Sequence, residues 1–232
     1  APPQKFPFNQ KVRDTISGLE GKLVGRAVYM NGCVRICIQQ ELITICSRDI
    51  LFYIASFGFT MNPKDHVECP TRPFLTYPYQ DVAIKQLSEA IGYHDIAVPK
   101  SRDMGATWIC LLAMEHQWHF FPERHFLLTS QVEELVESKS EKALFSKLDY
   151  WWNHLPQWLM PNKKRGLKSC LNSDVRSRFF GQATVPNIGR GDRLTAIFKD
   201  EAAEMANAGD IASATRDATN CRIFNSTPRG TG

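Results

Sequence analysis

The start of the chain shows two patterns of hydrophobic and polar residues. Residues 1–30 mix proline, glycine and charged residues with little periodicity, so we expect a flexible N-terminal arm there. Between Val34 and Phe59 the apolar residues recur at helical spacing, with a polar break at residues 47–49. This pattern predicts a pair of helices, and we assign residues 31–73 as a helical lead-in to the rest of the domain.

From residue 74 onward, short apolar runs alternate with segments of helical period. A helix is expected to run from near Gln80 to about Ile91, and a short apolar strand follows Asp95. Further strands are expected at residues 126–129, 177–182, 194–198 and 221–225, and further helices at residues 108–121, 132–152 and 211–218. This alternation favours an α/β fold in which helices flank a mainly parallel central sheet.

The composition fits one large α/β domain over residues 31–232. A chain of 232 residues, of which 43% are hydrophobic, can bury a full core. The net charge of +4 and the pI near 8.7 tolerate a polyanionic partner without requiring one. No run of about 18 apolar residues occurs, so we expect no membrane span.

The seven cysteines are odd in number and irregularly spaced. No signal-peptide pattern opens the sequence, so these cysteines indicate a reducing, cytosolic setting rather than a disulfide scaffold. Cys33 and Cys37 have no second pair that would complete four metal ligands, and apolar packing is their expected role. We expect His116, His119 and His125 to be packed or solvent-facing histidines of the core helix and its exit.

A polar turn joins the first expected strand to the next helix and has the features of an altered phosphate-binding loop. Backbone N–H groups at the start of a helix, together with its dipole, favour a bound phosphate. Laid over the pattern G-x-x-x-x-G-K-[ST], Lys100 takes the first glycine position, Gly105 the second, Ala106 the lysine position and Thr107 the position of the Mg²⁺-binding hydroxyl. Lys100 and Arg102 can supply the cation that Ala106 lacks. The structural alternative is a basic turn without a ligand.

The expected nucleotide-binding residues of this turn are Lys100, Ser101, Arg102, Asp103, Met104, Gly105, Ala106 and Thr107.

Two adjacent acids, Asp200 and Glu201, follow the apolar strand that begins near Leu194. Nucleotide hydrolases place one carboxylate near Mg²⁺ and another beside the attacking water at such a strand end. Asp200 is therefore the expected metal ligand, and Glu201 is the expected general base. The alternative, that the two acids only begin a loop or cap a helix, is about equally common for this segment alone.

The order of the segments decides between these alternatives. A strand, a phosphate-binding turn and a helix come first, and a strand ending in Asp200 and Glu201 comes later. A last strand then ends in Asn225, Ser226 and Thr227. This is the order of P-loop ATPases that carry an additional strand and a catalytic glutamate, the ASCE class. The sequence therefore predicts an ASCE-type P-loop NTPase with an N-terminal helical extension.

Together, these stretches resemble the ATPase domain of the large terminase subunit of tailed bacteriophages, the motor that packages DNA. The similar stretches begin at Cys46 and continue to the end of the chain. They are the segment Cys46–Ile54 with Thr60-Met-Asn-Pro, the adenine motif Tyr77-Pro-Tyr-Gln80, the altered Walker A turn Lys100–Thr107, the Walker B strand Ile197–Ala203 and the coupling motif Asn225–Gly230. Terminases form a family in which the Walker A lysine can lie at the front of the turn, as Lys100 does here.

The resemblance implies ATP and Mg²⁺ as cofactors and assigns a role to several residues. Gln80 is expected to bind the adenine edge, because its amide can donate and accept. Arg102 is expected to stabilise charge on the γ-phosphate within the same subunit. Asn225 to Thr227 are expected to sense loss of the γ-phosphate. Each has a structural alternative: a solvent-facing residue at the helix start for Gln80, a surface ion pair for Arg102 and a polar strand end for the coupling motif.

The resemblance also suggests an arginine that acts on a neighbouring subunit. Residues 187–193 precede the Walker B strand and contain glycines that let the backbone project a side chain outward. Arg190 is our candidate for an arginine finger inserted in trans, with Arg193 as the competing candidate. The alternative is a loop in which these arginines pair with Asp192 or contact DNA phosphates.

The partners that the resemblance implies are those of a viral packaging machine: double-stranded DNA, the portal protein of the procapsid and the small terminase subunit. A homo-oligomeric ring on the portal is expected, in the cytoplasm of an infected bacterial host. Large terminases also resemble two-part machines with a C-terminal nuclease. This chain ends just after the coupling motif, so we expect no nuclease activity from it.

A DNA-facing surface is a further hypothesis. Trp151, Trp152 and Trp158 precede the basic run Lys163-Lys164-Arg165 and Lys168, and clustered lysine and arginine neutralise phosphates. The competing interpretation places the aromatic residues in the core and the charges in a solvated loop.

Two other functions compete with a packaging ATPase. A helicase-like nucleic-acid translocase shares the same core but needs a second motor lobe. A degenerate P-loop module would bind nucleotide or a partner without turnover. Ala106 favours the degenerate module, whereas the intact pair Asp200 and Glu201 argues against it.

Overall fold

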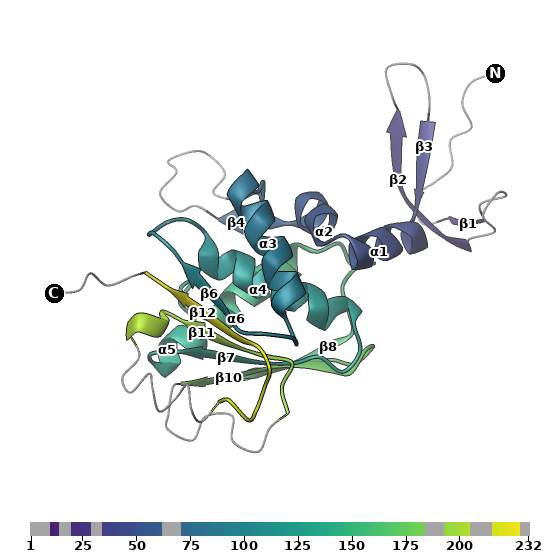
Figure 1. Ribbon diagram of the computed structural model, residues 1–232. Coiled ribbons are helices and arrows are strands. Elements are labelled where there is room, and N and C mark those ends of the chain that lie inside the picture. The colour runs from purple at the N-terminus through teal and green to yellow at the C-terminus, as the bar shows by residue number, and fades with distance from the viewer. Residues whose placement is uncertain are drawn as a thin grey trace, which may run out of the picture.

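The computed structural model describes residues 10–13, 20–28, 34–61, 71–183, 193–204 and 215–227. At its centre is a seven-stranded sheet with the strand order β6-β12-β11-β7-β10-β9-β8 (Figure 1). The strands in this order are β6 (Ile96–Pro99), β12 (Arg222–Ser226), β11 (Ala196–Asp200), β7 (His125–Ser130), β10 (Ser177–Ala183), β9 (Ser169–Asn172) and β8 (Lys163–Gly166).

The strand directions confirm a mainly parallel sheet. All neighbours from β6 to β10 are parallel, and only β9 and β8 run antiparallel to their neighbours. Strand β12 lies between β6 and β11, so an additional strand separates the strand before the phosphate-binding turn from the strand that ends in the two acids. The α/β fold class expected from the sequence is therefore confirmed.

Helices pack against this sheet, and the longest of them forms the core. The helices are α1 (Gln39–Arg48), α2 (Ile50–Phe57), α3 (Pro78–Ala90), α4 (Ala106–Phe120), α5 (Glu133–Val136) and α6 (Leu144–His154). In Figure 1, α2, α3 and α4 lie on one side of the sheet. Most residues of α4 are buried, as its almost uniformly apolar sequence predicts. On the other face of the sheet, Leu127, Ile197 and Ala218 form a smaller apolar cluster.

Aromatic residues fill the core between α4, α6 and β10. Trp118 of α4 lies with its ring centroid 4.9 Å from that of Trp152 and 5.6 Å from that of Phe179. Trp151 and Trp152 are 1% and 0% exposed. The hypothesis that these two tryptophans face DNA was therefore wrong: their spacing on α6 directs both into the core, where aromatic side chains bury large apolar areas.

The histidines and cysteines of the core are packed residues. His116 and His119 are buried on α4, where the Nδ1 atom of His119 lies 3.0 Å from both the Glu115 Oε1 and the Tyr53 hydroxyl. Four cysteines of the described residues are buried and unpaired: Cys46, Cys110, Cys170 and Cys221. Burial raises the pKa of the Cys46 thiol to about 12. These thiols therefore behave as small apolar side chains at neutral pH.

The N-terminal region differs in part from the sequence expectation. Helices α1 and α2 confirm the expected pair, but Val34–Ile38 forms strand β3 instead of the start of the first helix. In this run Val34, Ile36 and Ile38 alternate with other residues, which is the period of a strand.

Two more strands lie within the expected arm. β1 (Lys11–Arg13) pairs with β2 (Glu20–Val28), and β2 pairs with β3, in an antiparallel sheet that Figure 1 shows beyond the end of α1, away from the central sheet. The boundaries of the arm at residue 30 and of the lead-in at residue 73 stay predictions.

The hairpin of β8 and β9 was also missed, because its first strand is the basic run that the sequence placed in a loop. Lys163 and Arg165 point to the half-buried side of β8, while Lys164 is exposed. The ammonium of Lys163 lies 5.2 Å from the centroid of the Trp152 ring. Polar side chains that snorkel over a core in this way carry no apolar signal in the sequence.

Three other expectations have different outcomes. Residues 215–218 form a turn, and the rest of the helix expected at 211–218 lies outside the described residues. The helical period at 132–152 is split between α5 and α6. Among the described residues, no helix is both long and apolar enough to cross a membrane.

Candidate nucleotide-binding site

The expected site residues meet at one edge of the central sheet. β6 leads into Lys100, β11 ends at Asp200, and β12 ends at Ser226. Asp200 lies beside Asn225 in the parallel ladder of β11 and β12, and Ser226 lies beside Pro99. Because the carboxyl ends of parallel strands share one edge, motifs far apart in the sequence converge here.

The turn between β6 and α4 is held in a conformation that requires its glycine. Gly105 precedes α4 with φ 71° and ψ 14°, the left-handed region that glycine adopts without a steric penalty. An added Cβ would also lie 3.0 Å from the Gln80 side-chain nitrogen. Replacing this glycine would therefore disturb both the turn and its contact with α3.

Gln80 connects α3 to the turn through a side-chain hydrogen bond. Its Nε2 atom donates a hydrogen bond to the Met104 carbonyl at 2.9 Å, and its Oε1 atom accepts one from the Tyr77 N–H at 3.0 Å. The side chain is buried, so these bonds satisfy a polar group that would otherwise be costly to bury. Each of these atoms keeps one further hydrogen-bonding position that an adenine edge could use, and that role stays a prediction.

Three polar residues form a cluster at the start of α4. Thr107 Oγ1 donates to Asp200 Oδ1 at 3.1 Å, and Asn225 Nδ2 donates to the same oxygen at 2.6 Å. Burial raises the pKa of the Asp200 carboxyl, while the hydrogen bonds from Asn225 and Thr107 act in the opposite direction. The Asn225 Oδ1 atom is buried and has no hydrogen-bond partner among the described residues.

This cluster has the donor set of a magnesium site. Hydroxyl and carboxylate oxygens are ligands that Mg²⁺ accepts, usually alongside water and substrate phosphates. Thr107 and Asp200 supply one of each, and the unpartnered Asn225 Oδ1 can accept a hydrogen bond from a metal-bound water. The residues present therefore fit a Mg²⁺ ion that is bound together with phosphates.

Lys100 and Glu201 form an ion pair next to this cluster. The Lys100 ammonium lies 2.7 Å from Glu201 Oε1, and it also donates to Thr227 Oγ1 at 3.4 Å. Glu201 has φ 53°, a left-handed conformation that is uncommon for a residue with a side chain. Such strained backbone is concentrated at functional sites. One lysine thus contacts both the candidate general base and the coupling motif.

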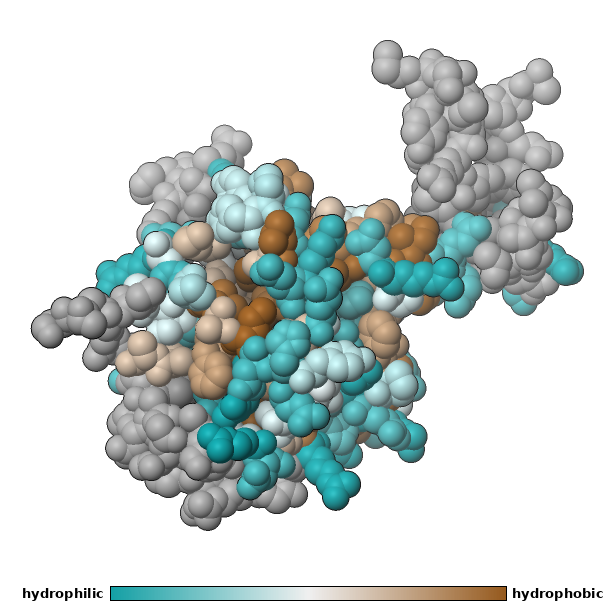
Figure 2. Space-filling model, viewed as in Figure 1, coloured by the Kyte–Doolittle hydropathy of each residue, from teal (hydrophilic) through white to brown (hydrophobic). Residues whose placement is uncertain are grey.

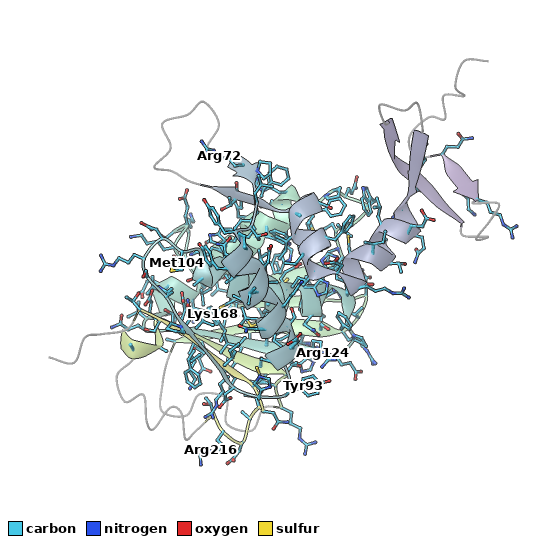
Figure 3. The ribbon with its side chains drawn as sticks, turned by 45° about the horizontal axis from the view of Figure 1, so that its top comes forward. Arg72, Tyr93, Met104, Arg124, Lys168 and Arg216 are labelled. Atoms are coloured by element: carbon cyan, nitrogen blue, oxygen red, sulfur yellow. The ribbon has the colours of Figure 1, made fainter. Side chains whose placement is uncertain are left out.

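A pocket of about 830 Å³ lies over the turn and α3. Its basic lining residues are Arg72, Lys100, Lys142 and Lys147, and its aromatic lining residues are Phe74, Tyr77, Tyr79 and Trp108. Figure 3 labels Arg72 and Met104, which line the pocket from strand β5 (Thr71–Pro73) and from the turn. The face in Figure 2 is mainly hydrophilic, with apolar areas beside α3 and along α1. The volume suits a small-molecule ligand of nucleotide size.

Most of the expected binding residues line this pocket. They are Gln80, Lys100, Ser101, Asp103, Met104, Gly105, Ala106 and Thr107. Arg102 is exposed and is not among the lining residues. Arg193 is exposed as well, and Arg190 lies outside the described residues. The roles assigned to these three arginines stay predictions.

Sequence reasoning missed several residues of the pocket. Arg72 comes from β5, which pairs with β4 (Phe59–Met61) across residues outside the described part of the chain. Lys142 comes from the turn before α6 and Lys147 from the first turns of α6, both far from any motif. No local signal marks them, because only the tertiary fold brings α6 to the turn.

Comparison with known proteins gives matches in structure. No protein-family model and no curated protein sequence matches this chain. The large terminase of bacteriophage HK97 matches with a TM-score of 0.56 and 13% identity, covering 78% of this chain and 37% of that chain. A mutant of the large terminase ATPase domain from Thermus phage P74-26 matches with a TM-score of 0.50 and 15% identity, covering 68% of each chain.

These matches confirm the resemblance at the level of the fold. The chain has the fold of large terminase ATPase domains, in an ASCE-type P-loop arrangement. It spans about 37% of the length of the HK97 protein, so activities of a whole terminase do not follow from the match.

Proposed function

We propose that this chain is the ATPase domain of a viral DNA-packaging motor, which hydrolyses ATP with Mg²⁺ to drive double-stranded DNA into a procapsid. The observation that carries the proposal is the convergence of two groups at one sheet edge. These are the cluster of Thr107, Asp200 and Asn225 and the ion pair of Lys100 with Glu201. In a P-loop ATPase this edge is where phosphates, metal and attacking water meet.

The turn provides the phosphate site. Backbone N–H groups at the start of α4 and the Lys100 ammonium would hold the β- and γ-phosphates. Thr107 and Asp200 would hold Mg²⁺, which neutralises charge on the transferring phosphoryl group when it is bound. Gln80 would read the adenine edge, and Arg102 would swing in to stabilise the γ-phosphate.

Glu201 is the proposed general base. In the structure its carboxylate is neutralised by Lys100 at 2.7 Å. An arriving phosphate competes for the same ammonium, and its capture would free Glu201 to accept a proton from the attacking water. Lys100 also contacts Thr227. A shift of Lys100 from Glu201 to the phosphate would therefore change this contact, and the coupling residues Asn225, Ser226 and Thr227 would sense the bound nucleotide.

The proposed assembly is a homo-oligomeric ring on the portal of the procapsid, working with the small terminase subunit in the cytoplasm of an infected bacterium. The terminase fold supports this assembly, since the two matched structures are a phage large terminase and a terminase ATPase domain.

Substituting the base tests the proposed chemistry. Glu201→Gln keeps the size of the side chain but removes the proton acceptor. We therefore expect it to bind Mg-ATP while its hydrolysis rate falls by ~10²–10⁴. Binding would be followed with a fluorescent ATP analogue, and hydrolysis by phosphate release with and without DNA. Glu134→Gln, at an exposed glutamate of α5, is the control. Hydrolysis by Glu201→Gln at the wild-type rate would remove Glu201 from this role.

Substituting the lysine at the front of the turn tests the phosphate site. Lys100→Ala should weaken ATP binding about tenfold or more, because a charged hydrogen bond to phosphate contributes roughly 1.5–3 kcal/mol. Adding Ala106→Lys to this variant should restore part of the affinity. Unchanged nucleotide affinity in Lys100→Ala would show that Lys100 is not the phosphate-binding lysine.

The second candidate function, nucleotide binding without turnover, is favoured by Ala106 at the usual lysine position. Wild-type protein that binds ATP but releases no phosphate, even when it is assembled on DNA, would select this candidate.

A further inference from the structure

The cations that line the pocket differ in how available they are to a bound phosphate. Ala106 is buried where a P-loop lysine would stand, and Lys100 is paired with Glu201. Lys142 is exposed at the rim of the pocket, whereas Lys147 is half-buried. ATP brings about four negative charges to such a site, so a further cation near the terminal phosphates would matter for affinity.

Lys147 is held at the pocket by the chain that precedes α6. Its ammonium donates to the carbonyl oxygens of Glu141, at 3.1 Å, and of Lys142. An ammonium has three N–H donors, and the described residues provide no further acceptor for the third. Glu141 and Lys142 also line the pocket, as Lys147 itself does, so the charge lies at the pocket wall.

Lys147 lines the same pocket as the residues of the phosphate-binding turn, among them Lys100 and Thr107. Burial lowers the pKa of Lys147, and the carboxylate of Asp200 acts in the opposite direction. The effect is mutual, because Lys147 also favours the ionised form of Asp200. Asp200 accepts a hydrogen bond from Thr107 at the start of α4, and Thr107 lines the pocket together with Lys147 of α6.

We propose that Lys147 binds the β- and γ-phosphates of the nucleotide from the α6 side and supplies the charge that Ala106 cannot. This inference rests on the proposed ATP site and deepens it. A lysine from α6 would close the phosphate site opposite the helix dipole of α4, so that the nucleotide is clamped between two helices. It would also couple the position of α6 to the nucleotide state.

The test compares nucleotides of different phosphate content. Lys147→Met removes the charge but keeps the length of the side chain, and Lys147→Arg keeps the charge. Lys139→Met, at an exposed lysine of the same segment, is the control for a general change in net charge. Binding of a fluorescent Mg-ATP analogue, and its displacement by unlabelled ATP, ADP and adenosine, would be measured for all three variants and the wild type.

We expect Lys147→Met to weaken ATP binding about tenfold or more, ADP binding less and adenosine binding not at all. Lys147→Arg should recover most of the loss, and Lys139→Met should resemble the wild type. Equal losses for ATP and adenosine, or an unchanged affinity for ATP, would overturn the inference and leave Lys147 as a structural tie for the loop before α6. If the wild type binds no nucleotide, the proposed function itself fails. Thermal unfolding of each variant separates lost binding from lost folding.

Discussion

At the scale of single residues, the site is a network in which one polar side chain hydrogen-bonds to two others. Asp200 accepts from both Thr107 and Asn225, and Lys100 serves both Glu201 and Thr227. In such shared networks the removal of one member leaves another group buried and unpaired, which costs more than the lost bond itself. We therefore expect these residues to respond as a unit if phosphate binds as proposed.

The sequence could predict these residues because each belongs to a motif with fixed spacing. Thr107 follows the phosphate turn and Asp200 ends a buried strand, so the sequence alone assigns each of them to its element. Lys147 and Arg72 could not be found in this way. Their positions depend on how α6 and β5 fold back onto the turn, and neither carries a local pattern that differs from an ordinary surface cation.

His116 provides a residue-scale prediction about pH. It is buried on α4 and donates from Nε2 to the Cys46 carbonyl at 2.8 Å, while its Nδ1 has no partner among the described residues. Burial lowers its pKa from the usual 6.5, although the nearby Glu115 and Asp49 favour the charged form and His119 opposes it. The unfolded chain therefore binds more protons than the folded protein just below pH 6.5, and stability falls as the pH drops through this range.

We expect His116→Gln to lose less stability than the wild type between about pH 7.5 and 5.5, since a glutamine amide can donate to Cys46 without titrating. Urea midpoints at the two pH values would measure the difference. His94→Gln, at an exposed position, is the control and should retain the wild-type pH dependence. An identical pH dependence in His116→Gln and the wild type would show that His116 does not contribute to the acid sensitivity.

At the scale of elements, strong periodicity and end signals were reliable. The expected helix after Tyr77 is α3, with Pro78 at its first position, and the buried helix after the turn is α4. β3 and the hairpin of β8 and β9 were not predicted. In β8 the stabilising contacts are long-range ones: Arg165 Nε lies 3.1 Å from Asp149 Oδ1 on α6, and Arg165 also pairs with Glu137.

The hairpin changes the hypothesis of a DNA-binding surface. Arg165 and Lys168 already pair with acidic side chains, Trp151 and Trp152 are buried, and Trp158 is partly buried against the core. The candidates that remain for phosphate contacts are Lys164, which is exposed, and Lys163, whose ammonium lies at the edge of the core. The DNA-binding surface that we propose is therefore this one strand of the hairpin and not a broad aromatic patch.

Reversing the charge of these two lysines tests this surface. We expect the double substitution Lys163→Glu and Lys164→Glu to weaken DNA binding and to reduce the slope of log affinity against log salt concentration by about 2, one for each lost phosphate contact. Fluorescence anisotropy with duplex DNA at several salt concentrations measures both. Lys85→Glu and Lys139→Glu together give the same change in net charge at exposed sites elsewhere. Equal slopes for the two double variants would exclude a local DNA contact on β8.

At the scale of the whole molecule, the fold class could be predicted because strand and helix alternate along most of the chain. The alternation alone could not give the strand order; the additional strand of the expected ASCE class is β12, which lies between β6 and β11. That insertion brings Asn225 beside Asp200, and so the last strand completes the cluster that the first motif begins. The order of the strands in the sheet therefore brings the Walker A turn, the Walker B strand and the coupling motif together in one site.

We expect a neighbouring subunit to complete the site. Asp200 and Glu201 lie at the sheet edge, and the segment that contains Arg190 precedes β11 by a few residues. An arginine finger increases phosphoryl transfer by ~10³–10⁵ because it neutralises charge that develops in the transition state. If Arg190 acts in trans, hydrolysis requires assembly, and a ring would hydrolyse ATP only where two subunits meet.

Mixed rings test this last prediction. Glu201→Gln subunits have an inactive site but keep Arg190, whereas Arg190→Ala subunits have an intact site but no finger. We expect each variant alone to be nearly inactive and the mixture to regain activity, because an Arg190→Ala site can receive the arginine of a Glu201→Gln neighbour. Arg193→Ala, tested in the same way, distinguishes the competing arginine. ATP hydrolysis by Arg190→Ala alone at the wild-type rate in assembled motors would place the finger elsewhere, and an inactive mixture would mean that Arg190 serves its own subunit.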